Sequence, residues 1–300
     1  GELIAETNTG HSYANWGDFE RVARVESGLL GAKLKVDAKN NRYIISKIYQ
    51  GENWNPARRS PLTEQGIEIK EGDYIIAIDG EDVTTEHNPY QFLENKVNKA
   101  VRITVNSKPV ATGARTYTIR PISSEEELSY LDWANSRRAM VDKLSGGRIG
   151  YMHVPNTAVE GNRELHRGMY AYHHKDALII DERFNGGGFI PDRMIELLSR
   201  ETHAHWQVAP GVAHDGPKAM LINQYSSSGG DAFPYFFRQR NLGTIIGTRT
   251  WGGLVGMSGN ASLMDGGYIA VPRFGIYNDK GEWIIEGIGV YPDIEVIDTP

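Results

Sequence analysis

The chain has 300 residues, 40% of them hydrophobic and 23% charged, which is the composition of an ordinary globular protein with a sizeable core. Its formal net charge of -6 argues against nucleic acid or an anionic membrane surface as the main partner. The chain contains no cysteine, which excludes disulfides, thiolate catalysis and Cys-ligated zinc. No apolar run approaches the ~18 residues of a membrane span. A cysteine-free chain fits a reducing compartment, so we expect a cytoplasmic location, with the periplasm as the alternative.

Residues 1–28 hold a short, partly apolar start, a polar turn and a predicted strand at 19–25. A segment of this length cannot bury a core of its own. We therefore expect residues 1–28 to pack on the catalytic part of the chain.

Residues 29–121 are predicted to form a small β-rich domain, because β-branched runs alternate with Gly and Pro turns. The expected strands are residues 43–49, 75–78, 101–105 and 116–120, and a helix is expected to open at Pro89 and run to about Asn98. The Gly28–Leu34 loop and the Glu71-Gly72-Asp73 turn resemble those of PDZ domains in bacterial and archaeal proteases. That resemblance implies a loop whose N–H groups hold a peptide carboxylate, beside an edge strand to which the peptide adds. The alternative is a packing domain whose groove is closed.

Residues 122–300 alternate between predicted strands and helices, which favours an α/β domain. Ser124 and Glu127 form a predicted capping box for a helix that ends at Gly146-Gly147. The further expected strands are residues 149–154, 177–181, 219–223 and 242–247, and the expected helices are residues 163–172, 194–200 and 232–240. The run at 177–181 is almost wholly apolar, as in a buried parallel sheet.

The stretch from Lys218 to Phe233 combines an apolar strand, a turn of three serines and two glycines, and an aromatic-rich helix. Strand, small-residue turn and helix form the geometry that lifts one side chain out at the carboxyl edge of a sheet. The same geometry aims free helix N–H groups at whatever that side chain attacks. A serine there needs a base, an orienting group and oxyanion donors. Without such partners, a solvated turn with no chemistry is the better interpretation.

Two further glycine turns and one carboxylate complete the candidate site. Asp181–Gly188 follows a buried strand and ends in three glycines, which suits an oxyanion hole. It also suits a phosphate cradle, but the Lys and Ser/Thr of a P-loop are missing. Thr248–Gly253 is the other glycine turn, and Glu286 stands between an apolar run and two glycines. Taken alone, Glu286 is an ordinary solvated carboxylate at a strand end.

In this order and spacing, these motifs resemble the tricorn proteases and the related C-terminal processing peptidases, over nearly the whole chain. The matching motifs are Asp181–Gly188, Asn223–Asp231, Thr248–Gly253 and Gly287–Asp293. The tricorn branch is favoured because His11 precedes the PDZ-like segment, whereas the processing peptidases use a serine–lysine pair and no lysine lies between Asn241 and Val271. Full tricorn proteases carry two β-propellers ahead of this core. We therefore expect either a piece of a longer protein or a shorter homologue.

The resemblance implies a role for each matching residue. Ser228, five positions after Asn223, is similar to the family's nucleophile, His11 to its general base and Glu286 to the carboxylate that orients the histidine. The N–H groups of Gly187 and Gly229 are the implied oxyanion donors. Tricorn proteases place a second serine just before the histidine, where this chain has Gly10. Ser12, a water or a direct contact between Glu286 and His11 then has to supply the link.

The implied activity is cleavage of peptides or unfolded polypeptides through an acyl-enzyme, with the PDZ domain binding or gating the substrate. The implied fold is a crotonase-like α/β sheet with an inserted PDZ domain. No cofactor and no metal are expected, because the pairs His173-His174 and His203/His205 come without a carboxylate cluster. Homo-oligomerisation of the full-length protein is a further expectation. The alternative function is a non-catalytic peptide-binding homologue, which the Gly10 departure favours. Asp192 and Glu201 are candidates for selecting basic substrate side chains.

Overall fold

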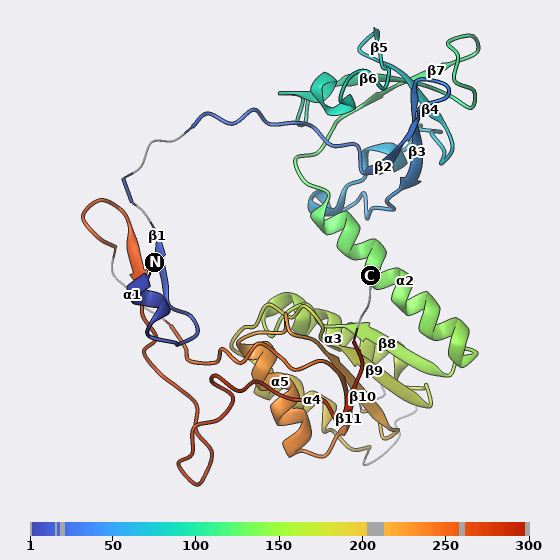
Figure 1. Cartoon of the computed structure of the whole chain (residues 1–300). Coiled ribbons are helices and arrows are strands. Elements are labelled where there is room, and N and C mark those ends of the chain that lie inside the picture. Colours follow the sequence, from blue (N-terminus) through green and yellow to red (C-terminus); the bar gives the residue numbers. More distant parts are fainter. Residues whose placement is uncertain (1, 16, 19–21, 203–212, 258–261, 298–300) are drawn as a thin grey trace. The chain divides into compact units, whose positions relative to one another are not determined.

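The computed structural model describes residues 2–15, 17–18, 22–202, 213–257 and 262–297. The chain forms two compact units, which we name by their sheets (Figure 1). The β unit is Arg21–Ser136, and the α/β unit combines Gly1–Glu20 with Arg137–Pro300. Helix α2 (Glu126–Ser145) begins in the β unit and ends in the α/β unit.

The β unit is built on an antiparallel six-stranded sheet with the order β2-β3-β4-β6-β7, in which β5 pairs with β4. Its elements are β2 (Ala32–Asp37), β3 (Arg42–Ile48), β4 (Tyr74–Ile78), β5 (Glu81–Asp82), β6 (Val101–Asn106) and β7 (Arg115–Ile119), with the 3-10 helices η1 (Pro56–Arg58), η2 (Pro61–Thr63) and η3 (Pro89–Leu93). Ile45, Ile75 and Ile103 are fully buried between the strands, so alternating β-branched residues form the core of this unit.

Two sequence predictions in this region are wrong. Residues 22–25 form no strand, and Val22 and Val25 are exposed, while residues 19–21 lie outside the described residues. The helix from Pro89 ends at Leu93, as the short 3-10 helix η3. Asn95 and Asn98 adopt left-handed φ angles of 56° and 57°, which a right-handed helix cannot contain.

The α/β unit contains a five-stranded parallel sheet with the order β13-β11-β10-β9-β8. Helices α3, α4 and α5 pack around this sheet (Figure 1). The elements of the α/β unit are α1 (Glu2–Ala5), β1 (Tyr13–Asn15), β8 (Ile149–His153), α3 (Val159–Tyr172), β9 (Ala177–Asp181), α4 (Pro191–Leu198), β10 (Lys218–Ile222), α5 (Gly229–Gln239), β11 (Gly243–Gly247), β12 (Tyr268–Ala270) and β13 (Ile294–Glu295). The α/β class predicted from the strand–helix alternation is confirmed.

The capping box predicted for α2 forms only in part. Ser124 Oγ accepts the N–H of Glu126 at 3.2 Å, but Glu127 pairs with Arg58 instead of turning back to cap the helix. The helix ends before Gly146 and Gly147, which both have positive φ angles, as the sequence predicted.

The N-terminal segment is joined to the rest of the α/β unit by strand pairing. Strand β1 pairs with β12 in antiparallel register, from Tyr13 opposite Ala270 to Asn15 opposite Tyr268. The first residues of the chain therefore lie beside a strand that is more than 250 positions away in sequence.

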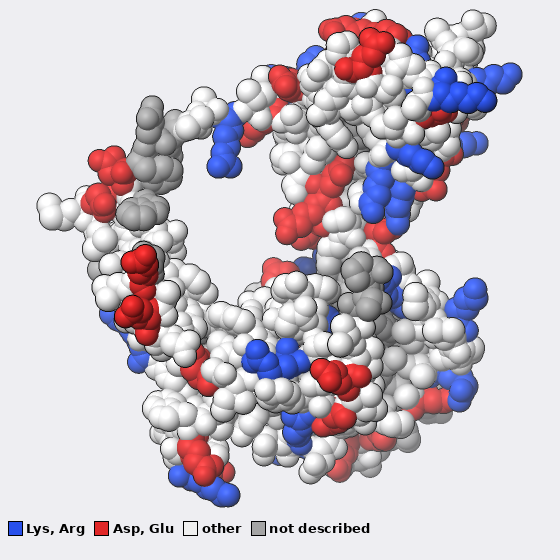
Figure 2. All heavy atoms as spheres, viewed as in Figure 1, with Lys and Arg blue, Asp and Glu red and all other residues white. Residues whose placement is uncertain are grey.

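The described surface carries mixed charge. Acidic and basic side chains are interspersed over the face that Figure 2 shows. Among the described residues, no helix is both long and apolar enough to cross a membrane.

Candidate active site

Ser228 lies at the turn between β10 and α5, as the N-cap residue of the helix. Its backbone angles are φ 57° and ψ -117°, a sparsely populated combination for a residue with a side chain. A strained backbone conformation persists only where the surrounding structure imposes it, and such conformations cluster at functional sites. Met220 and Ile222 anchor the preceding strand in the core. The rigid strand and helix thus fix the half-buried Ser228 in one orientation.

Gly187 and Gly229 border Ser228 in the same unit. A Cβ added to Gly187 would lie 2.7 Å from Ser228 Cβ and 3.1 Å from the nitrogen of Gly229, and Gly187 has a φ of +81°. A Cβ on Gly229 would lie 2.0 Å from Thr157 Oγ1. Glycine is therefore required at both positions, because the backbones of the two turns approach too closely for a side chain.

The two predicted oxyanion donors differ in what they contact. Gly229 is the first residue of α5, where an N–H has no intrahelical acceptor. The N–H of Gly187 donates to Asn185 Oδ1 at 2.9 Å. Asn185 is fully buried and its amide also donates to the carbonyl of Val154 at 3.1 Å, so its orientation is fixed.

Glu286 connects the two ends of the chain. Oε1 accepts the N–H of Gly10 at 2.7 Å, and Oε2 accepts the N–H groups of Leu254 and Val255 at 2.6 and 2.8 Å. The carboxylate thus reaches the backbone one residue before His11. A Cβ at Gly10 would lie 2.8 Å from Gly253 Cα. The glycine therefore allows its backbone N–H to approach the carboxylate.

His11 is half-buried, with a left-handed φ of 55°. Its ring packs edge-on against that of Trp251, with the ring centroids 5.5 Å apart. The backbone N–H of Trp251 donates to the carbonyl of Ser226 at 3.0 Å. Within the described structure, His11 Nδ1 is buried without a hydrogen-bond partner. No hydrogen bond links His11 to Ser228 or to the Glu286 carboxylate among the described contacts, and Ser12 pairs with Thr9 at 2.9 Å.

Two buried carboxyl groups behind the Ser228 turn were missed by sequence reasoning. Asp231, in the first turn of α5, is fully buried, and its Oδ1 accepts the N–H of Gly252 at 2.7 Å. Burial raises the pKa of Asp231. Its position three residues after the N-cap Ser228 is a signal that could have identified it. Through its hydrogen bond to Gly252, Asp231 links the Ser228 turn to the Thr248–Gly253 turn. Gly253 of that turn lies next to Gly10.

Glu182 is the second buried carboxyl. It follows β9, is 0% exposed, and neither of its carboxyl oxygens has a hydrogen-bond partner within the described structure. Burial raises the pKa of Glu182 well above its usual range, and the charges of Asp231 and Asp181 act in the same direction. The folded protein therefore holds Glu182 protonated over a wide pH range.

Glu182→Gln should stabilise the protein increasingly as pH rises. Below about pH 4 the carboxyl is protonated in both states. Above that pH only the unfolded chain ionises, so the wild type should lose about 1.4 kcal/mol relative to the variant for each pH unit, until the folded group ionises too. Urea unfolding between pH 4 and pH 8.5 measures this difference. The exposed Glu196→Gln is the control, and an offset independent of pH would contradict the prediction.

The other candidate residues do not gather into a further site. Within the described parts of the chain, no group of three or more His, Cys, Asp or Glu side chains could hold a metal ion. The rings of His173 and His174 are 5.4 Å apart and both residues are exposed, while His203 and His205 lie outside the described residues. Asp192, in the first turn of α4, and Glu201 are exposed.

Comparisons with known proteins identify both parts of the chain. The family model of the tricorn protease PDZ domain matches residues 28–124, and that of peptidase family S41 matches residues 148–296. The crystal structure of the tricorn protease superposes with a TM-score of 0.88 at 32% identity, covering 97% of this chain and 29% of that one.

Curated relatives match the same span. The tricorn protease of Thermoplasma acidophilum is 32% identical over 306 residues, which cover 100% of this chain and 28% of the relative. A putative tricorn-like protease C-terminal subunit of Sulfurisphaera tokodaii is 34% identical over 302 residues, which cover 98% of this chain and 34% of the relative. The chain thus spans about a third or less of the length of these relatives.

The chain therefore carries a PDZ domain of the tricorn type, followed by a domain of peptidase family S41. Over its whole length, the chain is similar to the tricorn proteases.

Proposed function

We propose that this chain hydrolyses peptides or unfolded polypeptides through an acyl-enzyme formed on Ser228. His11 is the general base, Glu286 orients it, and the N–H groups of Gly187 and Gly229 stabilise the oxyanion. The backbone angles of Ser228, at a rigid strand–helix turn bordered by two obligatory glycines, are the observation that carries the proposal.

The proposed steps follow acyl-transfer chemistry. Ser228 Oγ bonds to the substrate carbonyl carbon while its proton passes to His11. The carbonyl oxygen becomes an oxyanion that accepts the N–H of Gly229. The N–H of Gly187 leaves Asn185 Oδ1 and donates to the same oxyanion. The C–N bond then breaks as His11 returns the proton to the leaving amine. A water molecule, activated by His11, hydrolyses the ester and regenerates Ser228.

Glu286 acts in this proposal through the backbone. Its carboxylate accepts the N–H of Gly10 and two N–H groups from the opposite turn, so it fixes the segment that carries His11. This replaces the missing second serine with a main-chain donor. Charge-assisted hydrogen bonds of this kind are the stronger ones in proteins.

A serine-directed fluorophosphonate tests the proposed function. The reagent should label one residue, Ser228, and denatured protein should not react, because labelling depends on an assembled base and oxyanion hole. Mass spectrometry of the digested protein locates the adduct. A folded protein without any adduct would favour the non-catalytic peptide-binding homologue instead.

The domain boundaries expected from sequence enter the proposal as residues 1–28, 29–121 and 122–300. In it, the PDZ domain binds or gates the substrate, and the α/β sheet with its crossover helices belongs to the crotonase-like class. A cytoplasmic location and homo-oligomerisation of the full-length protein stay predictions.

A further inference from the structure

The loop expected to receive a peptide carboxylate already holds one from the same chain. The N–H groups of Gly31 and Ala32 both donate to Glu125 Oε1, at 2.7 and 3.2 Å. Gly31 has a φ of +74°, which turns successive N–H groups to one side and forms a small anion-binding concavity. Glu125 therefore occupies the position that the terminal carboxylate of a bound peptide takes in a PDZ domain.

Glu125 brings an apolar side chain with it. Leu128, one turn further on in α2, is 1% exposed, and its Cδ1 would lie 3.3 Å from a Cβ built on Gly31. Glu125 and Leu128 thus supply a carboxylate on the loop and an aliphatic side chain beside it. A peptide whose last residue is apolar would supply the same two groups. Strand β2, which follows the loop, is the edge of its sheet and exposes Lys33 and Lys35.

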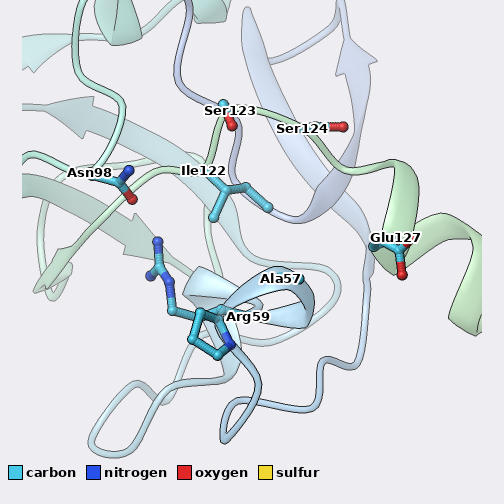
Figure 3. Close-up of a pocket in the computed structure, with 8 residues that line it drawn as sticks. Ala57, Arg59, Asn98, Ile122, Ser123, Ser124 and Glu127 are labelled. Atoms are coloured by element: carbon cyan, nitrogen blue, oxygen red, sulfur yellow. The ribbon is translucent and has the colours of Figure 1, made fainter.

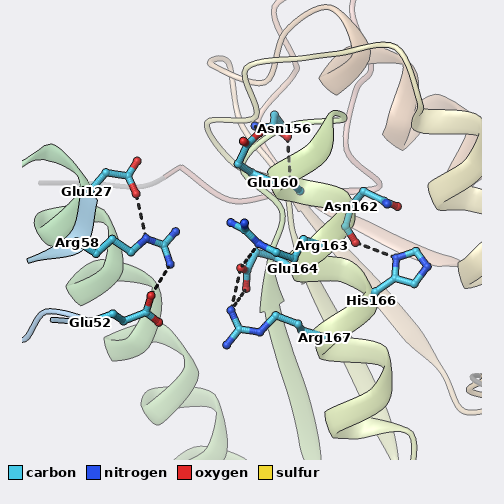
Figure 4. A network of polar contacts seen from close by, with 11 residues as sticks. Glu52, Arg58, Glu127, Asn156, Glu160, Asn162, Arg163, Glu164, His166 and Arg167 are labelled. Atoms are coloured by element: carbon cyan, nitrogen blue, oxygen red, sulfur yellow. Dashed lines mark hydrogen bonds and ion pairs between the residues drawn. The ribbon is translucent and has the colours of Figure 1, made fainter. Parts of the chain in front are cut away.

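Three further contacts hold the segment around Glu125 in place. Leu29 and Ile122 exchange two backbone hydrogen bonds of 2.8 and 3.0 Å. Arg58 bridges Glu127 and Glu52, with both contacts at 3.1 Å (Figure 4). The Arg58 side chain is only 11% exposed, whereas Glu127 is 53% exposed, so these few contacts hold the segment at its edge.

The same segment has open space beside it. A pocket of about 200 Å³ is bordered by its residues Ile122, Ser123 and Ser124, with Arg59 and Asn98 on the other side (Figure 3). The segment is thus packed on one side, against the loop, and has room to move on the other.

We propose that the Gly31–Ala32 loop binds the free α-carboxylate of a polypeptide with an apolar last residue, and that Glu125 is a built-in competitor for it. A chain end binds by displacing Glu125 together with the first turn of α2. Because Glu125 is tethered, its effective concentration at the loop is on the order of millimolar, and an external peptide has to overcome it. The inference rests on the proposed function for one point only, which is that such chain ends are its substrates or products.

Fluorescence anisotropy on the full 300-residue chain tests the proposal. The probe is a dye-labelled heptapeptide ending in leucine, with either a free carboxylate or an amide at its C-terminus. Every protein carries Ser228→Ala, so binding is measured without turnover and does not depend on the proposed catalysis. The variants compared are Glu125→Ala, Glu125→Gln and, as a control with the same change of charge, Glu126→Ala at an exposed neighbouring position.

Glu125→Ala should bind the free-acid peptide at least about ten-fold more tightly than the Glu125 protein, and Glu125→Gln should show a smaller gain. Glu126→Ala and the amidated peptide should show none. Equal affinity with and without Glu125, or an equal gain for the amidated peptide, would overturn the proposal. If Glu125→Ala does not fold, Glu125→Gln decides the matter, since it keeps the side-chain size but loses the charge.

A failed fluorophosphonate experiment would leave these binding results unaffected, so the two proposals can fail separately. The amide NMR resonances of Gly31 and Ala32 give an independent measurement. They should move upfield in Glu125→Ala and return when the free-acid peptide is added. Resonances that do not respond to the peptide would place its binding elsewhere and overturn the assignment.

Discussion

Ser228→Ala should abolish peptide hydrolysis while the protein stays folded. Removing the nucleophile of a serine peptidase lowers kcat by roughly 10⁶-fold. The serine side chain is half-buried at a turn that the backbone already fixes, so the melting temperature should stay within about 2 °C of the wild type. Progress curves with a fluorogenic peptide and thermal unfolding by circular dichroism provide the two measurements.

The two neighbouring serines supply matched controls. Ser227→Ala should leave kcat within about three-fold, since its described hydrogen bonds are made by the backbone alone, to Asn185 and Gly230. Ser226 is buried and donates to the carbonyl of Glu182 at 2.9 Å, so Ser226→Ala should lower stability by about 1 kcal/mol. Peptidase activity that survives in Ser228→Ala and disappears in Ser227→Ala would transfer the role of nucleophile to Ser227.

His11→Ala should lower kcat by about 10³-fold or more, because the proton of Ser228 then has no acceptor in the site. Added imidazole should partly restore the rate, a rescue that a purely structural role would not permit. The measurement is kcat with and without added imidazole.

Ser12→Ala is the control for the N-terminal segment. Ser12 contacts Thr9 at the surface, so its loss should change kcat by less than about three-fold if Glu286 acts through Gly10. A His11→Ala variant with an unchanged kcat would require a different base. In that case, the contact of His11 with Trp251 would be one of packing alone.

Local patterns predicted most of the fold. The apolar run at 177–181 and the alternation after it identified the parallel sheet, because buried parallel strands differ clearly in composition from the helices that connect them. The helix from Pro89 was overextended, because nothing in its local composition reveals that Asn95 and Asn98 adopt left-handed backbone angles.

Tertiary relations in the site could not be predicted in the same way. The glycine turns and Ser228 could be proposed from the sequence because their pattern lies in a short stretch of it. The contact between Glu286 and the N–H of Gly10 joins residues 276 positions apart, and a backbone donor leaves no mark in the side-chain pattern. Burial of Glu182 was equally hidden, since a carboxylate next to a strand end is normally solvated.

The shortness of strand β1 has a consequence for inactivation of the protein by warming and by proteolysis. Three residue pairs with β12, the Gly10–Glu286 hydrogen bond and the ring contact of His11 with Trp251 attach residues 2–15, which carry His11 to the proposed site. Such a short attachment opens at a lower free energy than the core unfolds. Inactivation on warming should therefore precede the loss of the circular dichroism signal. A protease that clips this segment should produce an intact but silent enzyme, which a synthetic peptide of the first residues could revive in trans.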